Sequence, residues 1–139
     1  MRTVEDRAGN RYVLLKESAD TSLVRDPESG TERHLPTAAL SPVDEPPLQT
    51  ATRAIPPERR RELDGVTGDR AIGLLLVLDA SGPIPVRDLL AETTLCESDL
   101  HGIVGELRAG GHVREADVGG ERGYAVTEDA SKKLDRLRD

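Results

Sequence analysis

The spacing of apolar residues divides the chain into three segments. In residues 1–45, short apolar runs are bounded by turn residues, which is typical of β-strands. From residue 69 to residue 139, apolar residues recur at the three- and four-residue spacing of helices. Residues 46–68 lie between these segments and are rich in proline and glycine. The pattern predicts a small β-meander, a linker with short helices, and a mainly helical domain.

The first segment predicts four antiparallel strands. They are expected at residues 3–5, 11–18, 21–25 and 31–35. A turn is predicted before the last strand, at Asp26-Pro27 and Gly30. Proline presets φ, and glycine supplies a positive φ. A meander of this size buries too little apolar area to stand alone. We therefore expect it to pack on the helical part or on a second subunit.

The linker predicts two short helices, at about residues 48–54 and 57–63. Pro57 suits the first position of a helix, because its missing N–H has no partner there. Gly65 and Gly68 are expected to end the second helix. The run Arg59-Arg60-Arg61 is the densest positive cluster of the chain, flanked by Glu58 and Glu62. Ion pairing within the helix is favoured over contact with phosphate.

The last segment predicts helix, helix, helix, hairpin and helix, in that order. The helices are expected at residues 69–78, 85–91, 97–109 and from 128 onward, with hairpin strands at 113–118 and 123–126. Ile84 could add a one-residue β bridge. The first helix is apolar nearly all round, so it should be buried, in part by a second subunit. The hairpin turn is expected at Gly119 to Arg122.

The helix at 97–109 has a clear core-facing side. Its apolar residues occur at positions i, i+3, i+4 and i+7, which form one stripe on a helix. They are Leu100, Ile103, Val104 and Leu107. The opposite side should therefore face solvent or a binding partner.

The amino-acid composition indicates the environment in which the protein works. Asp and Glu number 26 against 19 Lys and Arg, a net charge of -7, and Phe and Trp are absent. This acidic, lysine-poor composition resembles cytoplasmic haloarchaeal proteins, in which strong salt screens charge repulsion within about 3 Å at 1 M. A mesophile with a GC-rich genome is the alternative.

A cytoplasmic protein without membrane segments is expected. Cys96 is the only cysteine, which excludes an intrachain disulfide and fits a reducing compartment. The N-terminus has no apolar signal core. The longest apolar stretch, Ile72 to Leu78, is too short to span a bilayer.

Three pieces of the last segment together suggest a family. They are Val86 to Leu90, Ser98 to Val113 with its Gly110-Gly111 pair, and Tyr124 to Glu128. In this order they resemble the winged helix-turn-helix domains of MarR-like, ArsR-like and PadR-like regulators. The meander and this domain together also resemble a haloarchaeal protein family. The resemblance implies an α+β fold, a small antiparallel β-meander followed by a winged helix-turn-helix domain, and a transcription regulator that binds double-stranded DNA.

The resemblance also implies which residues would contact DNA. The helix at about 97–109 would enter the major groove, and the hairpin at about 113–126 would be the wing. The candidate contacts are Ser98, His101, Gly102, Gly105, Arg108 and, at the wing tip, Arg122. The Ser and His side chains can bond base edges, the arginines can bond phosphate or guanine, and the glycines permit close approach.

The charge of this helix leaves an alternative open. Glu97, Asp99 and Glu106 repel phosphate, so the helix carries more acid than base. The alternative function is a non-catalytic protein-interaction module on the same scaffold. For either function we expect a homodimer, with the meander serving assembly or a protein partner.

Other chemistry has little support in the sequence. Cys96, His101 and His112 suggest a metal sensor, but one thiol without a second close ligand pair argues against it. A redox role of Cys96 is possible at a helix start, although a half-buried structural role is favoured. No nucleophile motif, phosphate loop or carboxylate pair stands out, so we expect no enzyme, cofactor or metal.

Overall fold

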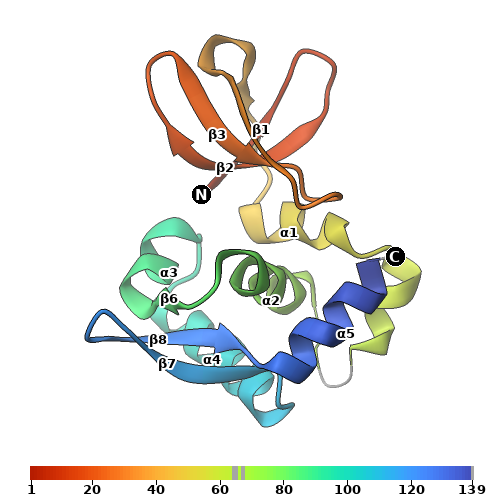
Figure 1. The fold of residues 1–139 in the computed structure, drawn as a ribbon, viewed down its shortest axis with the longest axis vertical. Coiled ribbons are helices and arrows are strands. Elements are labelled where there is room, and N and C mark those ends of the chain that lie inside the picture. Colours follow the sequence, from red (N-terminus) through yellow and green to blue (C-terminus); the bar gives the residue numbers. More distant parts are fainter. Residues whose placement is uncertain (64–65, 67, 139) are drawn as a thin grey trace.

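The chain forms an N-terminal antiparallel sheet placed over a mainly helical part. The computed structural model describes residues 1–63, 66 and 68–138. Figure 1 shows the sheet above, the helix α2 (Asp69–Ser81) in the middle of the helical part, and a second small sheet below. The fold is α+β, as the apolar spacing predicts.

The N-terminal sheet has five strands among the described residues. They are β1 (Arg2–Glu5), β2 (Arg11–Glu17), β3 (Thr21–Arg25), β4 (Glu32–Pro36) and β5 (Ser41–Pro42), in the order β4-β3-β2-β1-β5. The four expected strands are confirmed. The fifth was missed because two exposed residues that include a proline carry no strand pattern. It follows the short 3-10 helix η1 (Thr37–Ala39).

The linker is folded and contributes to the core. It contains α1 (Pro47–Ala51), η2 (Thr52–Ala54) and η3 (Pro57–Glu62). Short helices were expected here, but the last is a 3-10 helix, and Gly65 lies outside the described residues. Leu48, Ile55 and Leu63 are buried in the same core as α2. Arg60 holds the linker together by donating hydrogen bonds to the carbonyls of Ile55 and Thr52.

A polar chain joins the sheet to α1. The Thr3 and Thr50 hydroxyls lie 2.7 Å apart, and Thr50 donates to the Glu45 carboxylate at 2.6 Å. Arg11 and Arg53 lie 3.2 and 3.4 Å from the same carboxylate. The expected packing of the meander on the helical part is confirmed by contacts of β1 and β2 with α1. These bonds hold the N-terminal sheet against α1.

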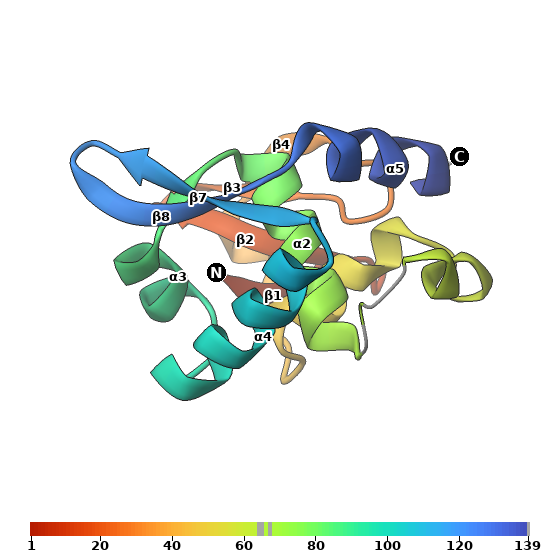
Figure 2. The same ribbon diagram turned by 90° about the horizontal axis from the view of Figure 1, so that it is seen from below.

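The helical part has a three-stranded sheet among its described residues. The elements after α2 are β6 (Ile84–Pro85), α3 (Val86–Glu92), α4 (Glu97–Ala109), β7 (Val113–Val118), β8 (Glu121–Val126) and α5 (Glu128–Arg138). The strand order is β6-β8-β7, and both pairings are antiparallel. Viewed from below, α3 and α4 lie on one side of the β7–β8 hairpin (Figure 2).

The helix α2 is buried within one chain. All residues from Ala71 to Leu78 are buried, as the all-round apolar sequence predicts. The cover on one side is α1, which packs directly on the backbone of α2. A Cβ atom at Gly73 would lie 2.0 Å from the carbonyl oxygen of Leu48. Burial of α2 therefore requires no second subunit.

We predict that Gly73→Ala destabilises the protein. An added Cβ must push α1 away from α2, and overpacking of this kind costs about 2–3 kcal/mol. Gly102→Ala is the matched control, because it is also inside a helix but meets nothing within 4 Å. The control should gain about 0.5–1 kcal/mol from helix propensity. Denaturant unfolding measures both, and equal effects would contradict the close contact at Gly73.

We also predict a pH-dependent contribution from Glu45. Burial opposes its charge, but the Thr50 hydrogen bond and the charges of Arg53 and Arg11 outweigh burial and hold the Glu45 pKa below its ordinary value of 4.5. A lowered folded-state pKa stabilises the fold above the unfolded-state pKa, and this stabilisation is lost as pH falls through the folded-state pKa.

The measurement is the free energy of unfolding of wild type and Glu45→Gln between pH 3 and 7. The difference between the two proteins should be largest above about pH 5 and shrink in acid. Glu17→Gln removes an equally charged group from an exposed pair with Arg2 and should change stability little. A difference for Glu45→Gln that does not vary with pH would contradict the prediction.

Candidate nucleic-acid interface

The helix α4 presents one buried side and one exposed side. Leu100, Val104 and Leu107 are buried and Ile103 is partly buried, which confirms the predicted stripe. The helix ends at Ala109 with Gly110 as its C-cap, and Gly111 has a positive φ of 77° that turns the chain into β7. A short reversal of this kind needs a residue without a Cβ. It places the C-terminal end of α4 beside the hairpin.

The exposed side of α4 carries all five of the candidate residues predicted on this helix. They are Ser98, His101, Gly102, Gly105 and Arg108. An added Cβ at either glycine would meet nothing within 4 Å. The middle of this face is therefore backbone open to solvent, and a partner surface could approach it closely.

The acids at the start of α4 are partly offset by neighbours. Arg70 from α2 lies 2.9 Å from the Asp99 carboxylate, and this hydrogen bond, followed by one from Cys96, lowers the pKa of Asp99. His101 Nε2 lies 3.7 Å from the Glu97 carboxylate. Because Arg70 opposes its charge, Asp99 repels phosphate less than the sequence of α4 alone suggests.

The two candidate arginines meet at one carboxylate. Arg108 Nη1 lies 3.1 Å and Arg122 Nη2 lies 2.9 Å from the same oxygen of Glu115, on β7. Arg122 also donates to the Tyr124 hydroxyl at 3.0 Å, and its guanidinium lies 5.7 Å from the centre of that ring. These residues form an arginine cluster, Arg108–Glu115–Arg122, between the end of α4 and the hairpin.

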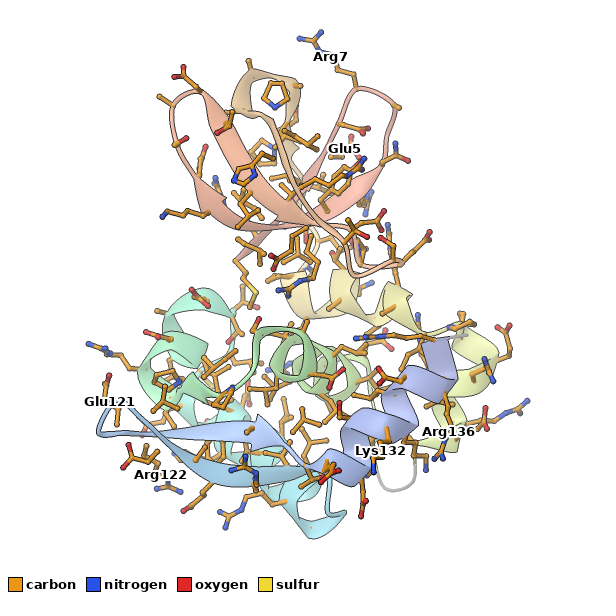
Figure 3. All side chains as sticks on the ribbon, in the orientation of Figure 1. Glu5, Arg7, Glu121, Arg122, Lys132 and Arg136 are labelled. Atoms are coloured by element: carbon orange, nitrogen blue, oxygen red, sulfur yellow. The ribbon has the colours of Figure 1, made fainter. Side chains whose placement is uncertain are left out.

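The hairpin turn is shorter than predicted, which moves Arg122. Gly119 and Gly120, with φ of 60° and 85°, make the turn alone, so β8 begins at Glu121. Two glycines suffice for a two-residue hairpin turn, which the four-residue prediction overlooked. Arg122 pairs in register with Asp117 inside the ladder, so its predicted place at the tip is wrong. Figure 3 shows it on the hairpin, far from Lys132 and Arg136 on α5.

The partners that hold these cations come from other elements of the fold. Glu115 forms ion pairs with two arginines, and Arg70 forms one with Asp99. Arg87 on α3 lies 2.9 Å from Glu121 on the hairpin. One signal for the first was available: the Gly110-Gly111 reversal brings the start of β7 back along the end of α4. The other two pairs link separate elements and depend on their packing.

The comparisons with known proteins find one matching family. A family model described as a family of unknown function, DUF7346, matches residues 1–138. The chain belongs to this family. No curated protein and no solved structure matches it. The DUF7346 match spans the N-terminal sheet as well as the helical part, so both parts belong to one family unit.

Other candidate chemistry of the DUF7346 chain is dispersed. Among the described residues, no group of three His, Cys, Asp or Glu side chains could hold a metal ion. Cys96 is exposed and lies 3.3 Å from the Ser98 hydroxyl, so its predicted half-buried position is wrong. The side chain precedes the first turn of α4 and faces solvent with it. No helix within the described ranges is long and apolar enough to cross a membrane.

We predict that Arg108→Ala and Arg122→Ala leave the stability of the DUF7346 chain almost unchanged. The side chains are 46% and 58% exposed, and exposed ion pairs contribute about 0–1 kcal/mol. The melting temperature should fall by at most about 4 °C. Tyr124→Ala, at a residue 2% exposed, is the contrasting variant and should cost about 3 kcal/mol. Losses of that size in either arginine variant would contradict their assignment to the surface.

Proposed function

We propose that the helical part is a winged helix-turn-helix domain and that the protein is a DNA-binding transcription regulator. In this proposal α4 is the recognition helix and the β7–β8 hairpin is the wing. The order α2-β6-α3-α4-β7-β8 with sheet order β6-β8-β7 supports it, because winged domains share that arrangement. The inference from fold to function is one of analogy.

The observation that carries the proposal is the shape and charge of the α4 surface. Its 13 residues make a rod of about 20 Å, which fits a major groove about 12 Å wide. Gly102 and Gly105 leave the backbone open in the middle of the rod. Arg108 and Arg122 stand together at its end, beside the hairpin. One helix and one hairpin could thus contact adjacent grooves of a duplex.

Binding requires Glu115 to release at least one arginine to a phosphate. A guanidinium has five N–H donors, so Arg122 can keep its Tyr124 contact and still bond a phosphate oxygen. Two phosphate contacts would give a salt slope of only about -2 in log affinity against log salt. Such weak dependence would suit an acidic protein that works in strong salt, as the composition suggests.

The direct test is DNA selection at molar KCl. Purified protein is mixed with genomic fragments, bound DNA is sequenced, and the enriched fragments are confirmed by fluorescence anisotropy. We expect reproducible enrichment of particular sequences. A protein that is folded by circular dichroism but enriches no DNA at any salt concentration would exclude this function.

We predict that removing the positive and the negative charges of the arginine cluster has opposite effects on DNA affinity. Arg108→Gln and Arg122→Gln should each weaken DNA binding about threefold to tenfold, which corresponds to roughly 1 kcal/mol. Glu115→Gln should strengthen it by a similar factor, because it removes both a repulsive charge and the competitor for the arginines. Anisotropy titrations measure the three affinities.

Matched controls lie at the far end of the molecule. Arg7→Gln and Glu5→Gln make the same charge changes on the N-terminal sheet, distant from the hairpin (Figure 3). They should leave the affinity almost unchanged. If Arg7→Gln weakens binding as much as Arg122→Gln, net charge alone governs it and the assigned face is wrong.

A second candidate function is a protein-interaction module, and one observation favours it. Arg70, Arg87, Arg108 and Arg122 are each engaged by an acid, so this face is close to neutral. A face of paired charges suits a protein partner better than a polyanion. Pull-down from lysate with and without nuclease separates the two functions. Partners that survive nuclease and carry no DNA would favour the second.

The proposal includes a cytoplasmic homodimer. The lone cysteine supports a reducing compartment. No large apolar side chain is exposed among the described residues, so a dimer of this chain would use a mainly polar interface. Sedimentation equilibrium at molar KCl measures the oligomeric state.

A further inference from the structure

A cleft runs between the N-terminal sheet and the helical part. It contains three adjoining hollows of about 480, 450 and 320 Å³. Ala54 and Arg138 line both the first and the second, while Arg25, Glu32 and Ala80 line both the second and the third. Arg138, at the C-terminal end of α5, and Ala51, in α1, both line the second hollow. The central hollow therefore joins residues from both ends of the chain.

The walls of the central hollow are about half apolar. Six of its twelve lining residues have small or aliphatic side chains: Val13, Ala51, Ala54, Leu76, Val77 and Ala80. Its volume of about 450 Å³ lies in the usual range of small-molecule sites, which also favour interfaces between parts of a protein. The charged groups come from Arg25, Glu32 and Arg138. Charges beside an apolar wall are what orient a small ligand.

Arg25 is a buried cation with donors to spare. Its side chain is only 10% exposed, and Nη2 lies 2.8 Å from Glu32. Among the described residues this is the one hydrogen bond that its guanidinium makes. Removing a cation from water costs several kcal/mol unless its donors are satisfied. One carboxylate leaves most of the five donors without a protein acceptor.

Arg138 approaches the same hollow from α5 and is also incompletely paired. Nη2 lies 3.5 Å from Asp79 and Nη1 lies 3.9 Å from Asp135, both long contacts. Its Nε is buried and, within the described part of the chain, is the only buried side-chain nitrogen or oxygen without a hydrogen-bond partner. Such an atom in a folded protein calls for an acceptor. Asp79 opposes the charge of Arg138 and Glu32 that of Arg25, but these carboxylates leave hydrogen-bond donors of both guanidiniums unsatisfied.

We propose that the central hollow binds a small organic carboxylate with a short apolar chain. The carboxylate accepts hydrogen bonds from Arg25 and Arg138, whose planar groups match its two oxygens. The chain packs on Leu76, Val77 and the alanines of α1 and α2. An inorganic anion would leave the apolar half of the walls uncovered, and a neutral molecule would offer only weaker acceptors to the unsatisfied donors. The proposal is independent of DNA binding.

The first experiment compares three probes that differ in one property each. Hexanoate, hexanol and inorganic phosphate are titrated into the full chain, at the salt concentration that gives the highest melting temperature. Amide NMR shifts and the melting temperature are recorded. We expect saturable shifts at residues lining the hollow and a rise in melting temperature with hexanoate. Hexanol and phosphate should bind at least tenfold more weakly.

The second experiment uses variants of the hollow and a matched control. Arg138→Gln should weaken hexanoate binding at least fivefold. Arg136→Gln makes the same change on an exposed residue of the same helix that does not line the hollow, and should bind as wild type (Figure 3). Ala80→Leu fills the hollow from a position that is exposed on α2, so it should abolish binding while the protein stays folded.

The outcomes decide the proposal. Hexanoate shifts that map to the hollow and are lost in Arg138→Gln and Ala80→Leu support it. No saturable shifts with hexanoate, equal binding of phosphate, or unaltered binding by both variants would overturn it. Melting curves without ligand show whether each variant is folded. A variant that unfolds is replaced by Arg138→Lys, which keeps the charge but loses the planar guanidinium. This variant should bind hexanoate more weakly than wild type.

Discussion

The contact between α1 and the backbone of α2 at Gly73 determines how the chain is assembled. Because the Leu48 carbonyl lies where a side chain would be, the two helices approach more closely than side chains normally permit. This approach buries α2 on the side away from the β7–β8 hairpin and carries the N-terminal sheet with α1. The Thr3–Thr50–Glu45 chain then fixes the sheet on the other side of the same short helix. Five residues of α1 thereby hold two sheets in one arrangement.

The candidate DNA-binding face also depends on contacts between separate elements. Its cations are held by acids from neighbouring elements, so the side chains are ordered before any partner arrives. Ordering reduces the entropy lost on binding, while competition from Glu115 reduces the energy gained. In the proposed function, this surface would select partners that offer a better acceptor than a carboxylate.

Periodicity gave most of the elements because it reports which side of each is buried. The bounds of α4 and β7 follow from an apolar stripe ending in Gly110-Gly111. Features that depend on three-dimensional packing escaped. Nothing local marks Ser41–Pro42 as a strand, because it exists only by pairing with β1. The sharing of Glu115 by two arginines likewise required the hairpin to fold back on α4.

The cleft has a temporal consequence. Arg25 lies in the third strand and Arg138 at the end of the last described helix, so the central hollow has no second cation until α5 has docked. During synthesis the N-terminal sheet emerges first, with its guanidinium paired to Glu32 alone. A compound recognised by both arginines would thus bind only after α5 has docked, and its binding would report that the helical part has closed on the N-terminal sheet.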